Sequence, residues 1–184
     1  MEIFDIVDEY GNPTGETVDR NTAHEKGIRH RTAHIWVVRK MNDSYEFLLQ
    51  KRSLDKDSYP GCYDTSSAGH IHVGDEPLVS ALRELEEELG ISAKTEDLHF
   101  MGTFRCGHTK EFYGKTFSNN EIAFLYIYNK PVDIDKLVLQ KEEVDSVMWI
   151  ELKKLESKLS PRDPEYCVPI DGFNIAKIWC LKNM

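Results

Sequence analysis

Long hydrophobic runs are absent, and no apolar stretch approaches the length that a helix needs to cross a bilayer. The opening residues, Met1 to Asp5, carry neither the basic nor the apolar segment of a secretory signal. We therefore expect a cytoplasmic protein with no membrane partner.

Cysteine is scarce, and no pair of cysteines has the C-x-x-C spacing of a zinc or redox site. The four are widely scattered: Cys62, Cys106, Cys167 and Cys180. A disulfide framework or a four-cysteine metal site is therefore not expected, and we predict free thiols.

Positively charged residues are outnumbered by negatively charged ones. The sequence has 23 Lys and Arg and 32 Asp and Glu, for a net charge of -9. A nucleic-acid partner needs a basic face, so none is expected. A phosphate ligand remains compatible with this charge, because bound metal ions can dominate the local field where acidic residues collect.

The 184 residues suffice for one domain with a proper core, and no repeat or Gly/Ser linker divides them. We predict a single domain over residues 1–184. Its fold class is predicted as α+β, a layered α/β/α arrangement around a mixed sheet. Strands are predicted at residues 3–7, 34–39, 46–52, 98–104, 122–128 and 146–150, and helices at residues 78–89, 151–159 and 172–181.

Three carboxylates lie on one side of the first predicted helix. Glu84, Glu87 and Glu88 are spaced i, i+3 and i+4, within reach of a common ion. Oxygen ligands of this kind suit magnesium or manganese. Arg83 precedes Glu87 by four residues and could hold that carboxylate in place. The alternative interpretation is an ordinary acidic amphipathic helix whose leucines face the core.

The segment from Gly69 to Ile91 resembles the Nudix box at nearly every defined position. The matching residues are Gly69, Arg83, Glu84, Leu85, Glu87, Glu88, Gly90 and Ile91. Asp75 is the one departure, because the family usually has Glu there. The resemblance implies a Nudix fold with the catalytic site on this helix and on the loop before it.

The same resemblance implies roles for individual residues. Glu84, Glu87 and Glu88 would bind Mg²⁺ or Mn²⁺, Arg83 would orient a glutamate, and Gly69 would bring a strand end close to the site. Bound metal ions would neutralise the diphosphate and activate a water molecule. A further carboxylate commonly completes such sites from outside the box. Glu121 is the candidate here, with an exposed loop acid as the alternative.

Substrate contacts are expected from residues flanking the box. Gly69 and His70 lie at its start, and Arg52 could contact a phosphate or lie on a solvated strand edge. Tyr59 could stack on a base or pack in the core. The partner would be a small-molecule diphosphate, selected by loops at residues 53–63, 105–120 and 160–172, and a homodimer is left open.

A second resemblance covers residues 4–150 and is to the Nudix subfamily of type I isopentenyl-diphosphate isomerase. It is carried by segments such as residues 30–36, 50–52, 59–64 and 66–70. Ala68 stands where that isomerase has its proton-shuttling cysteine, and Asn119 replaces one glutamate of an E-x-E pair that ends at Glu121. His24, His30 and His70 would correspond to its metal-binding histidines.

The residues that the isomerase reaction needs are therefore predicted to be incomplete. The residues that the hydrolase reaction needs are predicted to be present. For His30 and His34, a structural or substrate-contact role is favoured over a second metal site. The leading hypothesis is Mg²⁺-dependent hydrolysis of a diphosphate linkage in a nucleoside diphosphate derivative or a related organic diphosphate. The alternatives are isopentenyl-diphosphate isomerisation and a sensor that binds a nucleotide metabolite without turnover.

Overall fold

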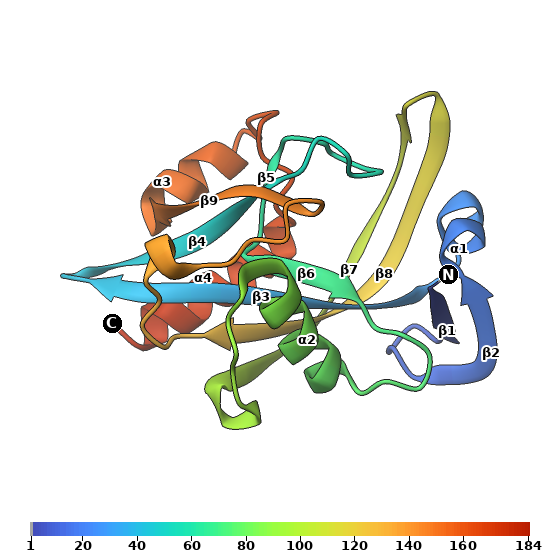
Figure 1. The fold of residues 1–184 in the computed structure, drawn as a ribbon, viewed down its shortest axis with the longest axis horizontal. Coiled ribbons are helices and arrows are strands. Elements are labelled where there is room, and N and C mark those ends of the chain that lie inside the picture. The colour runs from blue at the N-terminus through green and yellow to red at the C-terminus, as the bar shows by residue number, and fades with distance from the viewer. Residues whose placement is uncertain (1) are drawn as a thin grey trace.

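The computed structural model describes residues 2–184 as a mixed sheet with helices on both faces (Figure 1). Its strands are β3 (His30–Met41), β4 (Ser44–Arg52), β5 (Tyr63–Asp64), β6 (Ser67–His70), β7 (Leu98–Phe112), β8 (Lys115–Tyr128) and β9 (Val144–Glu151). The strand order is β5-β4-β3-β8-β7, with β6 paired to β3 and β9 to β4. The β3–β8 pair is parallel and the β3–β4 pair antiparallel, which confirms the predicted mixed sheet.

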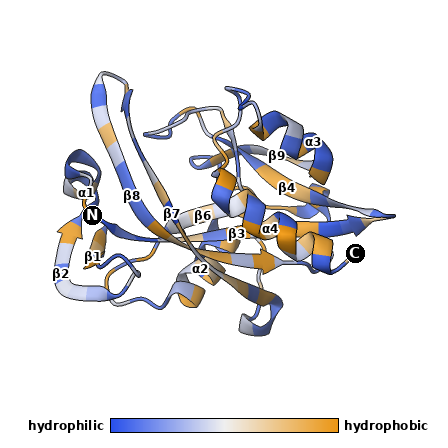
Figure 2. Ribbon diagram, turned by 180° about the vertical axis from the view of Figure 1, so that it is seen from behind, coloured by the Kyte–Doolittle hydropathy of each residue, from blue (hydrophilic) through white to orange (hydrophobic). Residues whose placement is uncertain are grey.

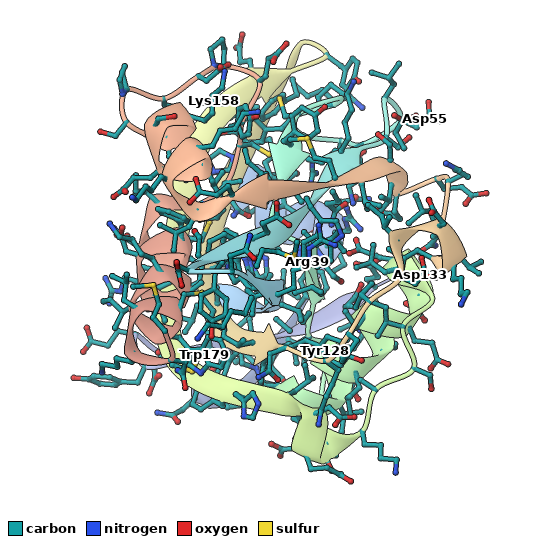
Figure 3. All side chains as sticks on the ribbon, turned by 90° about the vertical axis from the view of Figure 1, so that its left-hand side faces the viewer. Arg39, Asp55, Tyr128, Asp133, Lys158 and Trp179 are labelled. Atoms are coloured by element: carbon teal, nitrogen blue, oxygen red, sulfur yellow. The ribbon has the colours of Figure 1, made fainter. Side chains whose placement is uncertain are left out.

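Two hydrophobic cores lie on opposite faces of this sheet. One holds α3 (Leu152–Leu159) and α4 (Ile170–Lys182), and the other holds α2 (Pro77–Leu89). In Figure 3, Lys158 and Trp179 on α3 and α4 lie on one side, Asp133 lies on the other, and Arg39 of β3 lies between them. The predicted α/β/α layering is thus confirmed. Figure 2 shows long hydrophobic stretches on β4 and α4.

Helix α2 begins and ends as its sequence predicts. Pro77 occupies the first turn, where its missing N–H is not needed, and Gly90 ends the helix with φ +69°. Leu85 and Leu89 are fully buried against the sheet. Beside them Glu88 is also buried, whereas Glu86 and Glu87 lie on the exposed side of the helix.

The N-terminal segment contains two elements that periodicity did not predict. Strand β1 (Ile3–Val7) pairs with β2 (Pro13–Asp19), and α1 (Arg20–Lys26) follows. Most of β2 is exposed and lacks alternation, so only its pairing with β1 defines it. The short α1 has local signals at both ends, an Asp19 N-cap and Gly27 at φ +63°.

Residues 105–120 form a β-hairpin, so the prediction of a loop there was wrong. Strands β7 and β8 continue past the sheet with unbroken pairing from Arg105 opposite Ile122 to Phe112 opposite Lys115. We call residues 105–120 the hairpin arm; it rises beside α1 in Figure 1. Its residues are mostly polar on both faces, so hydrophobic patterning gave no strand signal. No helix among residues 2–184 is long and apolar enough to span a bilayer.

Candidate active site

Helix α2 carries Glu84, Glu87 and Glu88, and we call it the glutamate helix. It lies very close to strand β6 at Gly69. A Cβ atom at that position would overlap the carboxyl group of Glu84, so no side chain larger than hydrogen fits there without displacing Glu84. The predicted close approach of this strand end to the helix is therefore present. It places Glu84 at the edge of the sheet, facing a cavity.

Glu88 is held in a fixed orientation beneath the same cavity. It is 3% exposed and accepts hydrogen bonds from the side-chain amide of Gln50 and the backbone N–H of Ala68, both at 3.1 Å. Burial raises the pKa of Glu88 to about 7. Burial, together with the nearby charge of Glu88, also raises the pKa of Glu84 to about 7. A bound divalent cation would stabilise both in their ionised form.

Arg83 contacts both Glu84 and Glu87. Its pairing with Glu87 is the one that the four-residue spacing predicts. Its Nη1 atom lies 2.8 Å from Glu84 and 3.2 Å from Glu87, and its Nη2 atom donates to the carbonyl of His70 at 3.1 Å. The Glu87 side chain is 52% exposed at the cavity rim. Asp75 is not among the residues that line the cavity, and its carboxylate lies 4.0 Å from His72 instead.

Three histidines from different elements form a second cluster beside the first. His24 on α1, His30 on β3 and His70 on β6 each offer a ring nitrogen within 4.8 Å of the others. The Nε2 atoms of His24 and His70 are 3.2 Å apart. Burial lowers the pKa of His24 to about 4 and that of His70 well below its usual range, so both are neutral at pH 7. Neutral imidazoles are the form that binds a metal ion, and this cluster could hold one.

Glu121 belongs to this histidine cluster rather than to the glutamate helix. It is directly opposite His30 in the parallel β3–β8 pairing, and its Oε1 atom lies 3.7 Å from His30 and 3.8 Å from His70. Burial opposes its ionisation, but its contact with His30 lowers its pKa overall. At 8% exposed on β8, it is not the exposed loop acid considered as an alternative. His34 lies outside the cluster, with its ring edge-on to Phe104.

One cavity of about 590 Å³ joins both clusters. Gly69, His70, Arg52 and Tyr59, the predicted substrate contacts, all line it. Arg52 is held in position by Asp64 at 3.1 Å and by the carbonyl of Ser58. It is therefore part of the cavity wall and not a solvated strand edge.

Several cavity residues were missed by the sequence analysis. Lys56 pairs with Glu143, which precedes β9, and both line the cavity beside Glu88. Lys110 and Arg162 also line it. These residues have no motif or periodicity of their own, and only the fold brings them to the glutamates.

A comparison with known families fits this geometry. The family model of the NUDIX domain matches residues 28–167. This chain belongs to the Nudix family. The match includes the glutamate helix, the sheet and the hairpin arm, but not α1, which contributes His24.

Similar Nudix proteins come from distant organisms. The chain is 40% identical over 174 residues to Nudix hydrolase 3 of Arabidopsis thaliana, covering 92% of this chain but only 22% of that protein. It is 38% identical to an uncharacterized Nudix hydrolase of Clostridium acetobutylicum, covering 84% of this chain and 72% of the relative. An isopentenyl-diphosphate Δ-isomerase of Dinoroseobacter shibae is 28% identical over 88% of this chain and 86% of its own length.

Solved structures share the Nudix fold at low sequence identity. A Deinococcus radiodurans protein superposes with a TM-score of 0.70 at 12% identity, covering 97% of this chain and 99% of its own. An Ap4A hydrolase of Caenorhabditis elegans has a TM-score of 0.52 at 24% identity, covering 83% and 97% respectively. These likenesses support the fold.

Proposed function

We propose that this protein hydrolyses a diphosphate linkage in a nucleoside diphosphate derivative or a related organic diphosphate, in the cytoplasm, with Mg²⁺ or Mn²⁺ bound by Glu84, Glu87 and Glu88. The observation that carries the proposal is the fixed arrangement of Glu84 and Glu88 beneath one cavity. Gly69 lets Glu84 approach β6, and Gln50 and Ala68 fix Glu88. Carboxylates held in this way form a ready-made oxygen ligand set.

The surrounding residues have roles that follow from their positions. Metal ions bound to the glutamates would neutralise the diphosphate and lower the pKa of an attacking water. Arg83 keeps Glu84 and Glu87 together. Arg52 and Lys56, each already orientated by a carboxylate, present positive charge to phosphate oxygens.

Isopentenyl-diphosphate isomerisation is the second candidate, favoured by the histidine cluster and by isomerases among the relatives. The residues that this reaction would need for proton transfer argue against it. Ala68 cannot carry a proton, and its backbone N–H is already engaged with Glu88. Asn119 supplies an amide where the isomerase pattern has a carboxylate.

Product analysis distinguishes these functions. The protein is incubated with magnesium and with ADP-ribose, nucleotide sugars, dinucleoside polyphosphates, nucleoside di- and triphosphates, coenzyme A and isopentenyl diphosphate. Products are read by mass spectrometry and proton NMR, with and without chelator. We expect magnesium-dependent scission at a diphosphate. Isomerised isopentenyl diphosphate would instead support the second candidate, and tight binding without any product would support a non-catalytic sensor.

A further inference from the structure

The cavity wall formed by the hairpin arm and residues 160–169 carries positive charge that no side chain neutralises. Among residues 2–184, no carboxylate is ion-paired with Lys110 or Arg162. Arg162 donates to the carbonyl of Val168 at 3.0 Å. The other basic side chains of the cavity are each ion-paired with a carboxylate: Arg20, Arg52, Lys56, Arg83 and Arg105. Unpaired cations are thus confined to one part of the wall.

Two buried polar atoms in the same wall also lack partners. The Nε2 atom of His108 and the Oδ1 atom of Asn119 are buried and make no hydrogen bond within the described chain. The two residues are directly opposite each other in the β7–β8 pairing, and both line the cavity. The His108 Nε2 atom can donate to an anionic ligand in one tautomer, whereas the Asn119 Oδ1 atom only accepts and would need a donor such as a hydroxyl group.

Lys110, two residues beyond His108 on β7, and Arg162 line the same cavity as His108. Burial lowers the pKa of the His108 imidazole, the Glu121 carboxylate raises it, and the positive charges of Lys110 and Arg162 lower it further. A neutral imidazole with a free Nε2 can donate a hydrogen bond to an anionic oxygen in one tautomer.

Tyr59 packs against this part of the cavity wall. Its ring lies 4.8 Å from the ammonium of Lys110 and packs edge-on against His108, with centroids 5.2 Å apart. The residue has φ +47°, a left-handed conformation that non-glycine residues rarely adopt. The Tyr113 hydroxyl, near the tip of the arm, donates to the carbonyl of Leu54 at 3.0 Å and fastens the arm to the loop that carries Tyr59.

We propose that Lys110, Arg162 and His108 form a second anion subsite, which binds a phosphomonoester group that the substrate carries in addition to its scissile diphosphate. A phosphomonoester has near-dianionic charge and three acceptor oxygens, which match an ammonium, a guanidinium fork and a neutral imidazole donor. The inference rests on the proposed hydrolase function and narrows its substrate class.

Matched substrate pairs test the subsite. Coenzyme A and 3′-dephospho-coenzyme A differ by one phosphomonoester, as do NADPH and NADH, and each contains a diphosphate. We expect kcat/KM with magnesium to favour the phosphorylated member of at least one pair by about tenfold, the effect of one hydrogen bond to a charged group. Lys110→Met and Arg162→Gln should each reduce that preference several-fold. Lys115→Met is the control, because Lys115 is on the same arm but does not line the cavity, and the preference should be unchanged.

Binding of the same pairs is measured by calorimetry with calcium in place of magnesium, so that the subsite is judged apart from turnover. One outcome is that neither pair is cleaved, but the phosphorylated member binds more tightly and this preference is lost in Lys110→Met. That result would support the subsite and would contradict the proposed hydrolysis of these compounds. If both pairs show equal kcat/KM and equal binding in the wild type, the subsite is overturned. A preference that survives in the Lys110→Met, Arg162→Gln double variant also overturns it.

Discussion

The two clusters beside the cavity are built in different ways. The glutamates of α2 come from five consecutive positions of one helix, whereas the histidine cluster draws single residues from α1, β3, β6 and β8. Their chemistry differs as well. The helix offers three carboxylates, two with pKa values raised to about 7, while the other cluster offers imidazoles, those of His24 and His70 with lowered pKa values, around the carboxylate of Glu121, whose pKa is also lowered.

This difference predicts different metal preferences for the two clusters. Oxygen ligands suit Mg²⁺, which retains several water molecules and binds phosphate oxygens, whereas imidazoles suit Zn²⁺ and related ions. The two clusters are joined through consecutive residues of β6, since Gly69 touches Glu84 and His70 belongs to the histidines. The comparison predicts that hydrolysis depends on the first cluster far more than on the second.

The largest expected effect is that of Glu88→Gln. Replacing one carboxylate oxygen by an amide removes a metal ligand while preserving the shape that Gln50 and Ala68 contact. We expect kcat/KM for hydrolysis to fall by about a thousandfold, a loss typical of removing a principal charge-stabilising group. Steady-state kinetics with saturating magnesium measures it, and Glu86→Gln, on the exposed face of the same helix, is the matched control. Full activity in Glu88→Gln would remove this residue from the metal site.

Gly69→Ala should reduce hydrolysis by about a hundredfold, because the new methyl group would displace the Glu84 carboxyl by about 1 Å or more. The fold should persist, which circular dichroism and the melting temperature would verify. In Gly74→Ala nothing lies within 4 Å of the new Cβ, but φ is +77°, so this variant should lose stability without the same loss of hydrolysis. Equal activity of the Gly69→Ala variant and the wild type would show that Glu84 is free to move.

The metal-free protein should become less stable as pH rises from about 4.5 to about 7. The folded-state pKa values of Glu84 and Glu88 exceed the ordinary value of 4.5, so the folded protein holds protons that the unfolded chain releases. Each glutamate should contribute a loss of about 2 kcal/mol in unfolding free energy over this window. Urea unfolding in chelator at pH 5 and pH 8 measures the loss. Glu88→Gln should abolish its own share, and an unchanged pH dependence in that variant would contradict the buried charge.

Substitutions in the histidine cluster are expected to have the smallest effect on hydrolysis. Metal binding therefore tests this cluster better than the rate of hydrolysis does. Equilibrium dialysis against zinc should show that His24→Gln binds about one equivalent less than the wild type, because one of three imidazole ligands is lost. His99→Gln, at an exposed position of β7, is the control. Identical zinc content in His24→Gln and the wild type would mean that the cluster holds no ion.

Local sequence predicted the glutamate site because all of its signals lie within one stretch of chain. Leucine spacing and Gly90 predicted α2, and the carboxylate spacing follows from the helix. Gly69 was identified only through the family resemblance, and the overlap of a Cβ there with Glu84 supplies its physical reason. The role of Gln50 in holding Glu88 had no such signal, since an amide on a buried strand has many uses.

Assembly of the histidine cluster could not be derived from local patterns. His24 lies on a seven-residue polar helix that has no apolar period, and the residue was singled out by resemblance alone. Glu121 faces His30 only because β3 and β8 pair in parallel with that register. The strands of the hairpin arm were not predicted for a related reason. Its strands are mostly solvated, so cross-strand hydrogen bonds define it in place of hydrophobic alternation.

The most direct test compares Glu87→Gln with Glu121→Gln on one diphosphate substrate from the product screen, with magnesium, followed by phosphorus-31 NMR. Glu87 represents the glutamate helix and Glu121 the histidine cluster, and both line the same cavity. We expect Glu87→Gln to lose at least about a hundredfold in rate and Glu121→Gln no more than about tenfold. A larger loss in Glu121→Gln than in Glu87→Gln would contradict the assignment of hydrolysis to the glutamate helix.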